Sequence, residues 1–283
     1  MKVIRRLTAL KNSLRSGRKR RETVGFVPTM GYLHEGHLSL VRRARKESGR
    51  VVVSIFVNPL QFGPKEDFTR YPRDERRDLR LLKKEGVDVV YLPDEKKFYS
   101  PGFETRVSVT KLSRPLCGAS RPIHFTGVAT VVLKLLNQVS PDLLYLGQKD
   151  YQQCRVIERM TEDLDIPVRV RVCPTLREKD GLAMSSRNYY LDAEERMQAA
   201  YLNKALAEGE SLARSGVRNG EKIKGAMRKA LARATRGRVD YAEIVDAATL
   251  EPVVQLKPGQ KIELALAVFF SKTRLIDNRL IRV

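Results

Sequence analysis

The stretch Pro28-Thr29-Met30-Gly31-Tyr32-Leu33-His34-Glu35-Gly36-His37 decides how the fold of this chain is interpreted. It follows the short apolar run at residues 24–27 and precedes a helical pattern at residues 38–46. A strand that leads through a glycine-containing turn into a helix is the repeating unit of open parallel α/β sheets. Such sheets bind ligands beyond the carboxyl ends of their strands, where the N–H groups of a helix N-terminus face an anion. The stretch therefore predicts an anion-binding turn.

Two of the three histidines of the chain lie in this turn, three residues apart. Paired imidazoles can donate hydrogen bonds to one phosphate chain, and Gly31 and Gly36 allow the backbone to approach it closely. Metal ligation is one alternative, but two histidines without a third nearby ligand are a weak zinc pattern, since His124 is far away in sequence. A pair of incidental surface histidines is the other alternative. The pattern favours phosphate binding over both.

Strand and helix signals alternate over the first two-thirds of the chain. Further strands are expected at residues 51–57, 87–92, 143–146 and 168–172, and helices at residues 75–84, 128–139 and 151–161. After residue 174, helical patterns at residues 193–213 and 221–235 precede strand-like runs at residues 241–245, 262–270 and 275–276. We therefore expect an α/β fold: a Rossmann-like parallel sheet flanked by helices in residues 1–175, and a smaller α+β C-terminal domain in residues 176–283.

Three more motifs carry groups suited to a nucleotide or a small substrate. Gly147-Gln148-Lys149-Asp150 follows a predicted strand and combines a point charge for phosphate with an acceptor for a ribose hydroxyl, although Asp150 could simply cap a helix. The segment at residues 180–188 joins a glycine turn to two serines and an arginine, which suits phosphate, or serves as a polar linker. Asn58 and Gln61 at another strand end, with Gln153 on a helix, suit a small hydroxylated substrate, or are surface amides.

Composition bounds the class of protein. The 283 residues, with 42% hydrophobic and 31% charged side chains, are typical of a globular chain of about two domains. No apolar run approaches the ~18–20 residues of a membrane span, and no signal-peptide core follows the basic N-terminus. The three cysteines, Cys117, Cys154 and Cys173, form no CxxC pair, which favours reduced thiols and a cytoplasmic location over disulfides or a zinc ribbon.

The charge is strongly positive. With 54 Lys and Arg against 33 Asp and Glu, the formal net charge is +21, a field that attracts anions of any kind. Basic runs such as residues 42–46 have no tryptophan and no interleaved aromatic residues, so a stacking platform for single-stranded nucleic acid is not indicated. Neither a membrane nor a nucleic acid is expected as a partner.

The histidine turn looks like the HxGH signature of the nucleotidyltransferase superfamily, and the whole chain resembles one family within it, the pantoate–β-alanine ligases or pantothenate synthetases. The matching stretches run from residue 27 to residue 278: residues 27–31, 56–62, 71–73, 120–122, 124–125, 147–150, 180–188 and 274–278. Their combination in this order is specific, although single members are not. The resemblance implies an ATP-dependent synthesis of pantothenate through pantoyl adenylate, a step of coenzyme A biosynthesis, with release of AMP and pyrophosphate.

The resemblance also implies roles for residues. His37, as proton donor, with His34 and Lys149, is implied to act in catalysis. The implied ATP-binding residues are Met30, Gly31, Tyr32, Leu33, His34, Glu35, Gly36, His37, Gly147, Gln148, Lys149, Asp150, Leu176, Met184, Ser185, Ser186 and Arg187. Those implied to bind substrate are Gln61, Gln153, Asn58 and Arg121, with His124 nearby. Mg²⁺ is implied as the companion of ATP, with unknown protein ligands and Asp78 as a candidate, and so are a homodimer and a C-terminal domain that acts as a lid.

Some positions depart from related patterns. Aligned on Met184, the two lysines of the synthetase-type KMSKS loop are replaced by Ala183 and Ser186, and Arg187 supplies the cation, which favours the pantoate–β-alanine ligases over tRNA synthetases. Ile123 stands where the family usually has glycine. Two other functions remain open: another HxGH nucleotidylyltransferase, and a basic RNA-binding protein, for which no RNA motif is visible.

Overall fold

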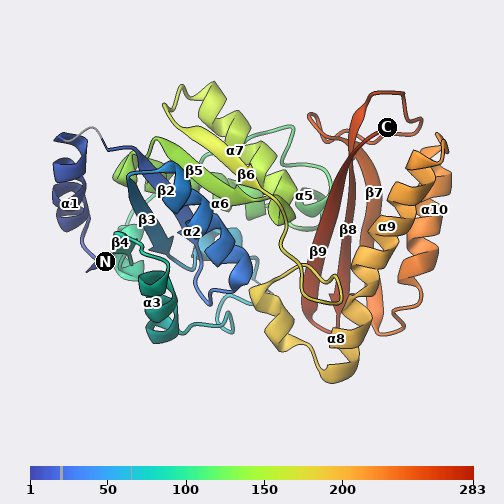
Figure 1. The fold of residues 1–283 in the computed structure, drawn as a ribbon, viewed down its shortest axis with the longest axis horizontal. Helices are drawn as coiled ribbons and strands as arrows, with labels where there is room; N and C mark the ends of the chain where they lie inside the picture. The colour runs from blue at the N-terminus through green and yellow to red at the C-terminus, as the bar shows by residue number, and fades with distance from the viewer. Residues whose placement is uncertain (20–21, 65) are drawn as a thin grey trace. The chain divides into compact units, whose positions relative to one another are not determined.

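The computed structural model describes residues 1–19, 22–64 and 66–283. By its internal contacts the chain divides into two compact units (Figure 1). The first comprises Met1–Ser113, Arg121–Gly147 and Gln153–Pro174. The second comprises Arg114–Ser120, Gln148–Gln152 and Thr175–Val283. Two short segments from the first two-thirds of the sequence thus belong to the second unit.

A six-stranded sheet forms the centre of the first unit, with every neighbouring pair parallel and the order β1-β4-β3-β2-β5-β6. The strands are β1 (Lys2–Ile4), β2 (Val24–Thr29), β3 (Arg50–Ile55), β4 (Val89–Tyr91), β5 (Leu143–Gly147) and β6 (Arg169–Cys173). From β2 the chain proceeds to β3 and β4 in one direction, and β5 and β6 lie in the other. The order therefore reverses between β2 and β5, which is where open α/β sheets bind their ligands.

Helices cover the sheet: α1 (Leu7–Lys19), α2 (Glu35–Glu47), α3 (Glu75–Lys84), α4 (Glu95–Phe98), α6 (His124–Val139) and α7 (Tyr151–Asp163). Val41 of α2 and Leu82 of α3 share one apolar cluster with Val53 of β3, all without solvent exposure. Side chains alternate along a strand, so Val52, which is equally buried, faces the other side of the sheet. Burial on both faces explains why three consecutive valines, Val51–Val53, form the middle of β3.

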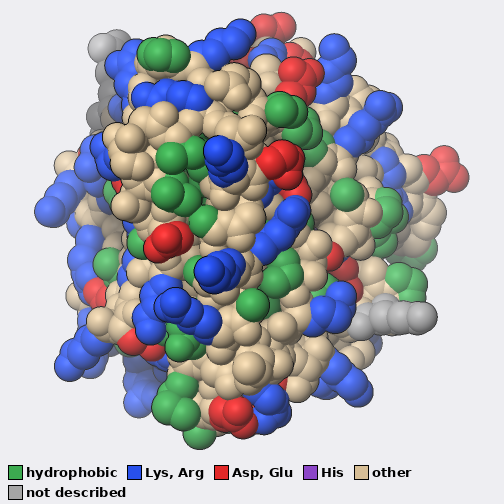
Figure 2. All heavy atoms as spheres, turned by 90° about the vertical axis from the view of Figure 1, so that its right-hand side faces the viewer, with side chains coloured by type: hydrophobic (Ala, Val, Ile, Leu, Met, Phe, Trp, Pro, Cys, Tyr) green, Lys and Arg blue, Asp and Glu red, His purple; other side chains and the backbone are tan. Residues whose placement is uncertain are grey.

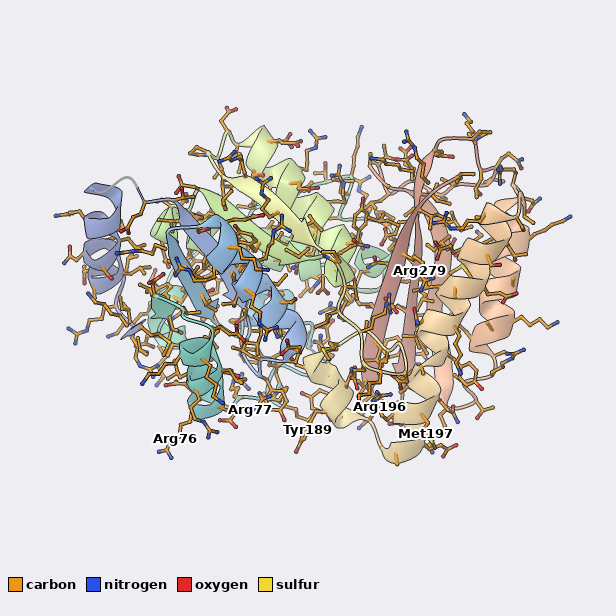
Figure 3. The ribbon with its side chains drawn as sticks, viewed as in Figure 1. Arg76, Arg77, Tyr189, Arg196, Met197 and Arg279 are labelled. Carbon is orange, nitrogen blue, oxygen red and sulfur yellow. The ribbon has the colours of Figure 1, made fainter. Side chains whose placement is uncertain are left out.

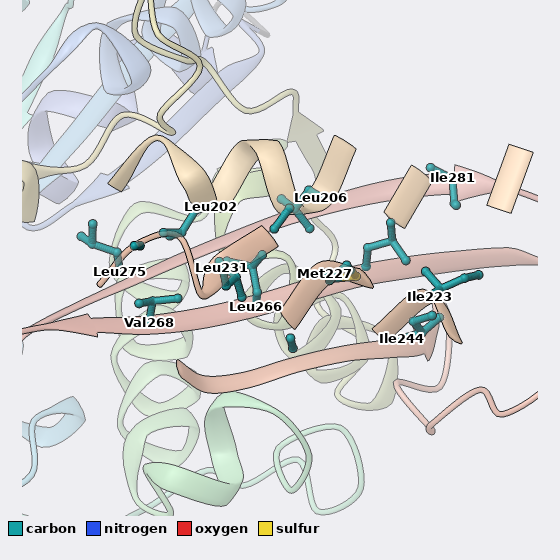
Figure 4. Packing of buried hydrophobic residues seen from close by; sticks show 14 of the residues in the cluster. Leu202, Leu206, Ile223, Met227, Leu231, Ile244, Leu266, Val268, Leu275 and Ile281 are labelled. Atoms are coloured by element: carbon teal, nitrogen blue, oxygen red, sulfur yellow. The ribbon is translucent and has the colours of Figure 1, made fainter. Parts of the chain in front are cut away.

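The second unit has an antiparallel sheet in the order β7-β8-β9 and three helices that supply its core. The strands are β7 (Gly237–Asp246), β8 (Lys261–Phe270) and β9 (Thr273–Arg282), and the helices are α8 (Ala193–Ala199), α9 (Tyr201–Arg214) and α10 (Gly220–Leu231). Figure 4 shows Leu206 of α9 and Met227 of α10 packed with Leu266 of β8. The short helix α5 (Cys117–Ser120) and the 3-10 turns η2 (Gln148–Asp150) and η3 (Ser186–Tyr190) also belong to this unit.

The predicted fold class is confirmed: a parallel sheet flanked by helices, and a smaller unit of helices and antiparallel strands. The single helix expected at residues 193–213 is wrong, because the chain turns at Ala200 and forms two helices. No Gly or Pro marks this break; Ala199, Ala200 and Leu202 are all buried, so tertiary packing sets it. The strand expected at residues 275–276 is far longer, Thr273–Arg282.

One face of the molecule shows how its positive charge is distributed. On the face drawn in Figure 2, Lys and Arg side chains are spread widely, with Asp and Glu between them and no single basic stripe. In the part of the chain that the structure describes, no helix has both the length and the apolar character needed to cross a bilayer.

Candidate active site

The buried carboxylate of Asp78 fixes the backbone of the turn after β2. Oδ2 of Asp78 accepts from the N–H of Tyr32 at 2.7 Å, and Oδ1 accepts from the N–H of Leu33 at 2.8 Å. Gly31 has φ +82°, and a Cβ there would lie 2.9 Å from a methyl of Ile55, so glycine is required. Burial raises the pKa of Asp78, against the lowering effect of the two N–H groups. Asp78 therefore shapes the turn.

The two histidines stand at the start of α2. His34 is the residue before the first helical turn, and its N–H donates to Nδ1 of His37 at 3.3 Å. The two rings lie 4.0 Å apart, measured between centroids. Because Nδ1 of His37 accepts a hydrogen bond, the neutral ring carries its proton on Nε2 and donates from there. The geometry thus presents an N–H donor beside a helix N-terminus, where anions are favoured.

A second polar group follows β3. The 3-10 turn η1 (Pro59–Gln61) is capped by Asn58, whose Oδ1 accepts from the N–H of Leu60 at 3.3 Å. Nδ2 of Asn58 donates to Oε1 of Gln61 at 3.1 Å and to the carbonyl of Gly127 at 3.1 Å. The Tyr99 hydroxyl donates to Oδ1 of Asn58 at 2.8 Å. Asn58 is 1% exposed, so its hydrogen-bonding capacity is used inside the protein.

Gln61 is oriented from both sides. Its Nε2 lies 3.2 Å from Sδ of Met30, which belongs to the histidine turn, and only 8% of the residue is exposed. The backbone carbonyl oxygen of Gln61 lies 3.0 Å from Nδ1 of His124 and accepts a hydrogen bond from Nη2 of Arg121 at 3.3 Å. At Gly127 of α6, a Cβ would lie 2.2 Å from the carbonyl oxygen of Leu60. This helix and the turn that carries Gln61 are therefore in backbone contact.

The guanidinium of Arg121 forms a two-pronged ion pair with Glu66, at 2.8 Å from Nε and 2.5 Å from Nη2. Burial alone would raise the pKa of Glu66, but the hydrogen bonds and charge of Arg121 outweigh it, so the pKa lies below its usual value. Ile123 has φ −90° and ψ −12°, ordinary helical values, and is 52% exposed. The turn therefore accommodates isoleucine where the related family usually has glycine.

The predicted site residues of the second unit occupy two segments. Lys149 lies in η2 after the end of β5, is 21% exposed, and has its ammonium 3.8 Å from Oδ1 of Asp150. The other segment is a hairpin, in which the N–H of Met184 donates to the carbonyl of Leu176 at 3.0 Å. Ser185 caps η3 by accepting from the N–H of Arg187 at 3.2 Å.

The hairpin at residues 176–184 is braced by charge. Arg196 of α8, labelled in Figure 3, donates to Asp180 at 2.5 Å and to Glu178 at 2.6 Å. These contacts hold the pKa of Asp180 below its usual value, against the smaller effect of burial. Gly181 has φ +90°, so the tip of the hairpin is a glycine turn.

Within the first unit, the structure brings together Met30, Asn58, Gln61, Arg121 and His124, and it pairs His34 with His37. Gln153 lies on α7 and is half-buried. Sequence reasoning missed three supporting residues: Asp78 as the holder of the turn, Glu66 as the partner of Arg121, and Tyr99 behind Asn58. Each acts through a contact between residues distant in sequence, so no local pattern marks it.

The described residues contain no group of three or more His, Cys, Asp or Glu side chains placed to hold a metal ion. Both oxygens of Asp78 accept from the turn and the residue is 1% exposed, so the structure gives it a supporting role in place of the metal-ligand role considered above.

A parallel sheet whose order reverses beside an HxGH turn defines a Rossmann-like α/β protein, a class that binds its ligands at such a reversal. The family model described as "Pantoate-beta-alanine ligase" matches residues 2–280. The pantothenate synthetase of Thermotoga neapolitana is 54% identical over 281 residues, 99% of this chain and 100% of that protein. That of Caldicellulosiruptor saccharolyticus is 50% identical over 283 residues, all of both chains.

Solved structures agree. Pantothenate synthetase from Thermus thermophilus has a TM-score of 0.93 and 47% identity, covering 99% of each chain. Pantoate-beta-alanine ligase from Francisella tularensis, complexed with beta-gamma ATP and beta-alanine, has a TM-score of 0.81 and 35% identity, covering 99% of this chain and 97% of that one. The chain belongs to the pantoate–β-alanine ligase family.

Proposed function

We propose that the chain joins (R)-pantoate to β-alanine in two steps. The pantoate carboxylate attacks the α-phosphorus of ATP, forming pantoyl adenylate and releasing pyrophosphate. The β-alanine amine then attacks the acyl carbon, forming the amide bond of pantothenate while AMP leaves. The single observation that carries the proposal is the histidine turn at the reversal between β2 and β5. A nucleotide phosphate is the ligand that this combination of imidazole donors and helix N-terminus suits best.

We propose that His37 and His34 stabilise the triphosphate as negative charge develops during the first step. The Nε2–H of His37 is the proton-bearing donor, because Nδ1 is engaged by the His34 backbone. Donors that are fixed before the reaction stabilise developing charge without reorganising during the step. The turn residues that accompany them in ATP binding are Met30, Gly31, Tyr32, Leu33, Glu35 and Gly36.

The residues proposed to bind ATP from the second unit supply further charge and hydrogen bonds. Lys149 is a point charge suited to phosphate, and Arg187 is a planar fork that suits phosphate geometry. Asp150, with Gly147 at the end of β5, is proposed to hold the ribose. Gln148, Leu176, Met184, Ser185 and Ser186 complete the set. We propose that the second unit acts as a lid over the bound substrates.

We propose that Gln61 and Gln153 bind pantoate, with Gln61 also near β-alanine. The contacts of Asn58 and Arg121 support a role in substrate binding that acts through Gln61. Asn58 orients the side-chain amide of Gln61, and Arg121 contacts its backbone carbonyl. His124 contacts the same carbonyl. These residues then fix the orientation of Gln61, which fixes the orientation of the attacking carboxylate.

Mg²⁺ is proposed as the companion of ATP. Because the described residues offer no cluster of metal-ligating side chains, it fits as an ion held by phosphate oxygens and water. The resemblance to the family supports a homodimer, which light scattering at micromolar concentration would reveal. None of the three cysteines is in a disulfide, which supports a cytoplasmic location.

The decisive experiment measures AMP and pyrophosphate release from ATP with D-pantoate, with and without β-alanine, and follows pantothenate by mass spectrometry. We expect AMP and pantothenate together only when both substrates are present. A stable nucleotidyl product would instead identify a nucleotidylyltransferase. Salt-sensitive RNA binding without ATP turnover would identify an RNA-binding protein; the scattered charge in Figure 2 does not favour it.

A further inference from the structure

Two adjacent polar residues of β9, Asp277 and Asn278, are buried at 2% and 4% exposure and have no role in the reaction described so far. Neighbouring residues of a strand point to opposite faces of the sheet. Asp277 and Asn278 therefore serve two different faces. Each contacts one of the two second-unit segments proposed to bind ATP.

Asn278 holds the segment that carries Lys149. Its Nδ2 donates to the carbonyl of Gln148 at 2.9 Å and to the carbonyl of Lys149 at 2.8 Å. A side-chain amide has two N–H donors, and these contacts use both. An aspartate at this position would have the same shape, but its carboxylate would face two carbonyl oxygens without a donor. The chemistry of the amide is therefore what the position requires.

Asp277 holds the hairpin that carries Leu176 and Met184. Its Oδ2 accepts from Nη1 of Arg177 at 2.6 Å, and its Oδ1 accepts from Nη2 at 3.0 Å. Nη1 of Arg177 also donates to the carbonyl of Gly181, at the tip of the hairpin, at 3.0 Å. Such a parallel pair of hydrogen bonds fixes the orientation of a guanidinium as well as its position. Asp277 thereby anchors the first strand of the hairpin to β9 and, through Arg177, its tip at Gly181.

We propose that Asp277 and Asn278 form a positioning pair, which fixes the Lys149 segment relative to the hairpin at residues 176–184 so that both meet the triphosphate during adenylate formation. All of the contacts lie within the second unit. Neither residue contacts substrate; each acts through backbone groups or through Arg177. The inference rests on the proposed function and assigns a role to the segment at residues 274–278, which the reaction had left unexplained.

The test separates the two half-reactions. In Asn278→Leu, kcat/KM for ATP in pantoate-dependent pyrophosphate release should fall at least about tenfold, the factor that corresponds to ~1.4 kcal/mol. The kcat for aminolysis of supplied pantoyl adenylate by β-alanine should stay within about twofold of wild type, because that step no longer involves the departing pyrophosphate. Arg177→Lys, which breaks the fork at a partly exposed residue, should show the same selective loss.

Arg279→Met is the matched control. Arg279 is the next residue of β9 (Figure 3), and its guanidinium contacts Glu210 at 2.6 Å and Asn203 at 2.7 Å on α9. This variant should lose thermal stability while keeping both half-reactions. If Asn278→Leu does not fold, the two half-reactions of Arg177→Lys test the proposal in its place. Equal losses in both half-reactions, or wild-type kinetics, would overturn the pairing proposal. A wild-type protein without turnover would instead overturn the proposed function.

Discussion

The side-chain amide of Asn58 donates a 3.1 Å hydrogen bond to Oε1 of Gln61. With one end of the Gln61 amide held in this way, its Nε2 is directed to the side of the histidine turn, where Met30 lies. The orientation of Gln61 is therefore set by a buried residue before any substrate arrives. This relationship lets the effects of binding and of orientation be separated by mutation.

Gln61→Ala should raise the KM for pantoate at least about tenfold while the KM for ATP changes little, because a lost hydrogen bond to a charged group is worth ~1.5–3 kcal/mol. Steady-state kinetics with each substrate varied in turn provides the measurement. Equal increases in both KM values would contradict the assignment of Gln61 to pantoate.

Asn58→Asp should weaken pantoate use as well, since a carboxylate in the place of the amide would face the Gln61 and Gly127 oxygens without a donor. Tyr99→Phe is the control, because it removes only the hydroxyl that donates to Oδ1 of Asn58. The control should change the KM for pantoate far less. If Asn58→Asp kept a wild-type KM for pantoate, the orientation of Gln61 would not depend on Asn58.

His37→Ala should lower kcat by about 10²–10⁴, the range for loss of a positioned proton donor. Its thermal unfolding should stay close to that of wild type, because the ring accepts one long hydrogen bond from the His34 backbone, at 3.3 Å, at the helix start. Ser39→Ala on the same helix removes a hydrogen bond to the Gly36 carbonyl and serves as control. Near-normal turnover in His37→Ala would remove His37 from the mechanism.

Asp78→Asn should raise the KM for ATP at least about tenfold, because an amide keeps one acceptor and turns a donor toward the second N–H of the turn. The KM for pantoate should change little. The Mg²⁺ concentration required for half-maximal rate should also stay the same, since both carboxylate oxygens contact the backbone. A selective shift of the Mg²⁺ requirement would show instead that Asp78 binds the metal.

Glu263→Gln should make the protein more stable at alkaline pH. Glu263 of β8 is 2% exposed, and its Oε2 has no hydrogen-bond partner among the residues that the structure describes. Burial raises its pKa to about 8, above the value of 4.5 for a solvated glutamate. The folded state therefore binds the proton more tightly than the unfolded state. The contribution of Glu263 to stability is full below pH 4.5 and is lost as pH rises toward 8, at up to about 1.4 kcal/mol per pH unit.

Thermal unfolding from pH 5 to pH 9 checks this prediction. The neutral glutamine mimics the protonated acid, so the two proteins should unfold at similar temperatures at pH 5. The variant should unfold several degrees higher at pH 9, where ~1 kcal/mol corresponds to about 2–4 °C in a protein of this size. Parallel curves across this range would mean that Glu263 titrates normally.

Local patterns predicted the elements that depend on local chemistry. The helix at Glu75–Lys84 has the bounds expected from the sequence, because Asp74 caps its first turn. The strand β1 was not anticipated, since three residues show no alternation and pair only with the distant β4. The strand β9 was predicted far too short, because its charged and polar residues interrupt the apolar pattern.

The same contrast holds for the candidate site. The glycines and histidines of the turn can be recognised in the sequence, because they act together within one short stretch of the chain. The supporting roles of Asp78 and Asn278 are not visible, because each acts on backbone groups more than 40 residues away. A carboxylate in a charged helix and an amide in a strand look like ordinary surface residues. Only the fold shows that they are buried and which groups they hold.

The tight turn between β8 and β9 has a consequence for how the family can vary. Phe270 pairs with Thr273, so only Ser271 and Lys272 connect the two strands, and Ser271 has φ +49°. In a hairpin the length of the connection fixes the register, and a slip of one residue exchanges the faces of every side chain. An insertion of a single amino acid at this surface turn would send Asn278 toward the helices and Asp277 toward two carbonyl oxygens. Under the positioning role proposed for Asp277 and Asn278, the length of this exposed loop constrains catalysis.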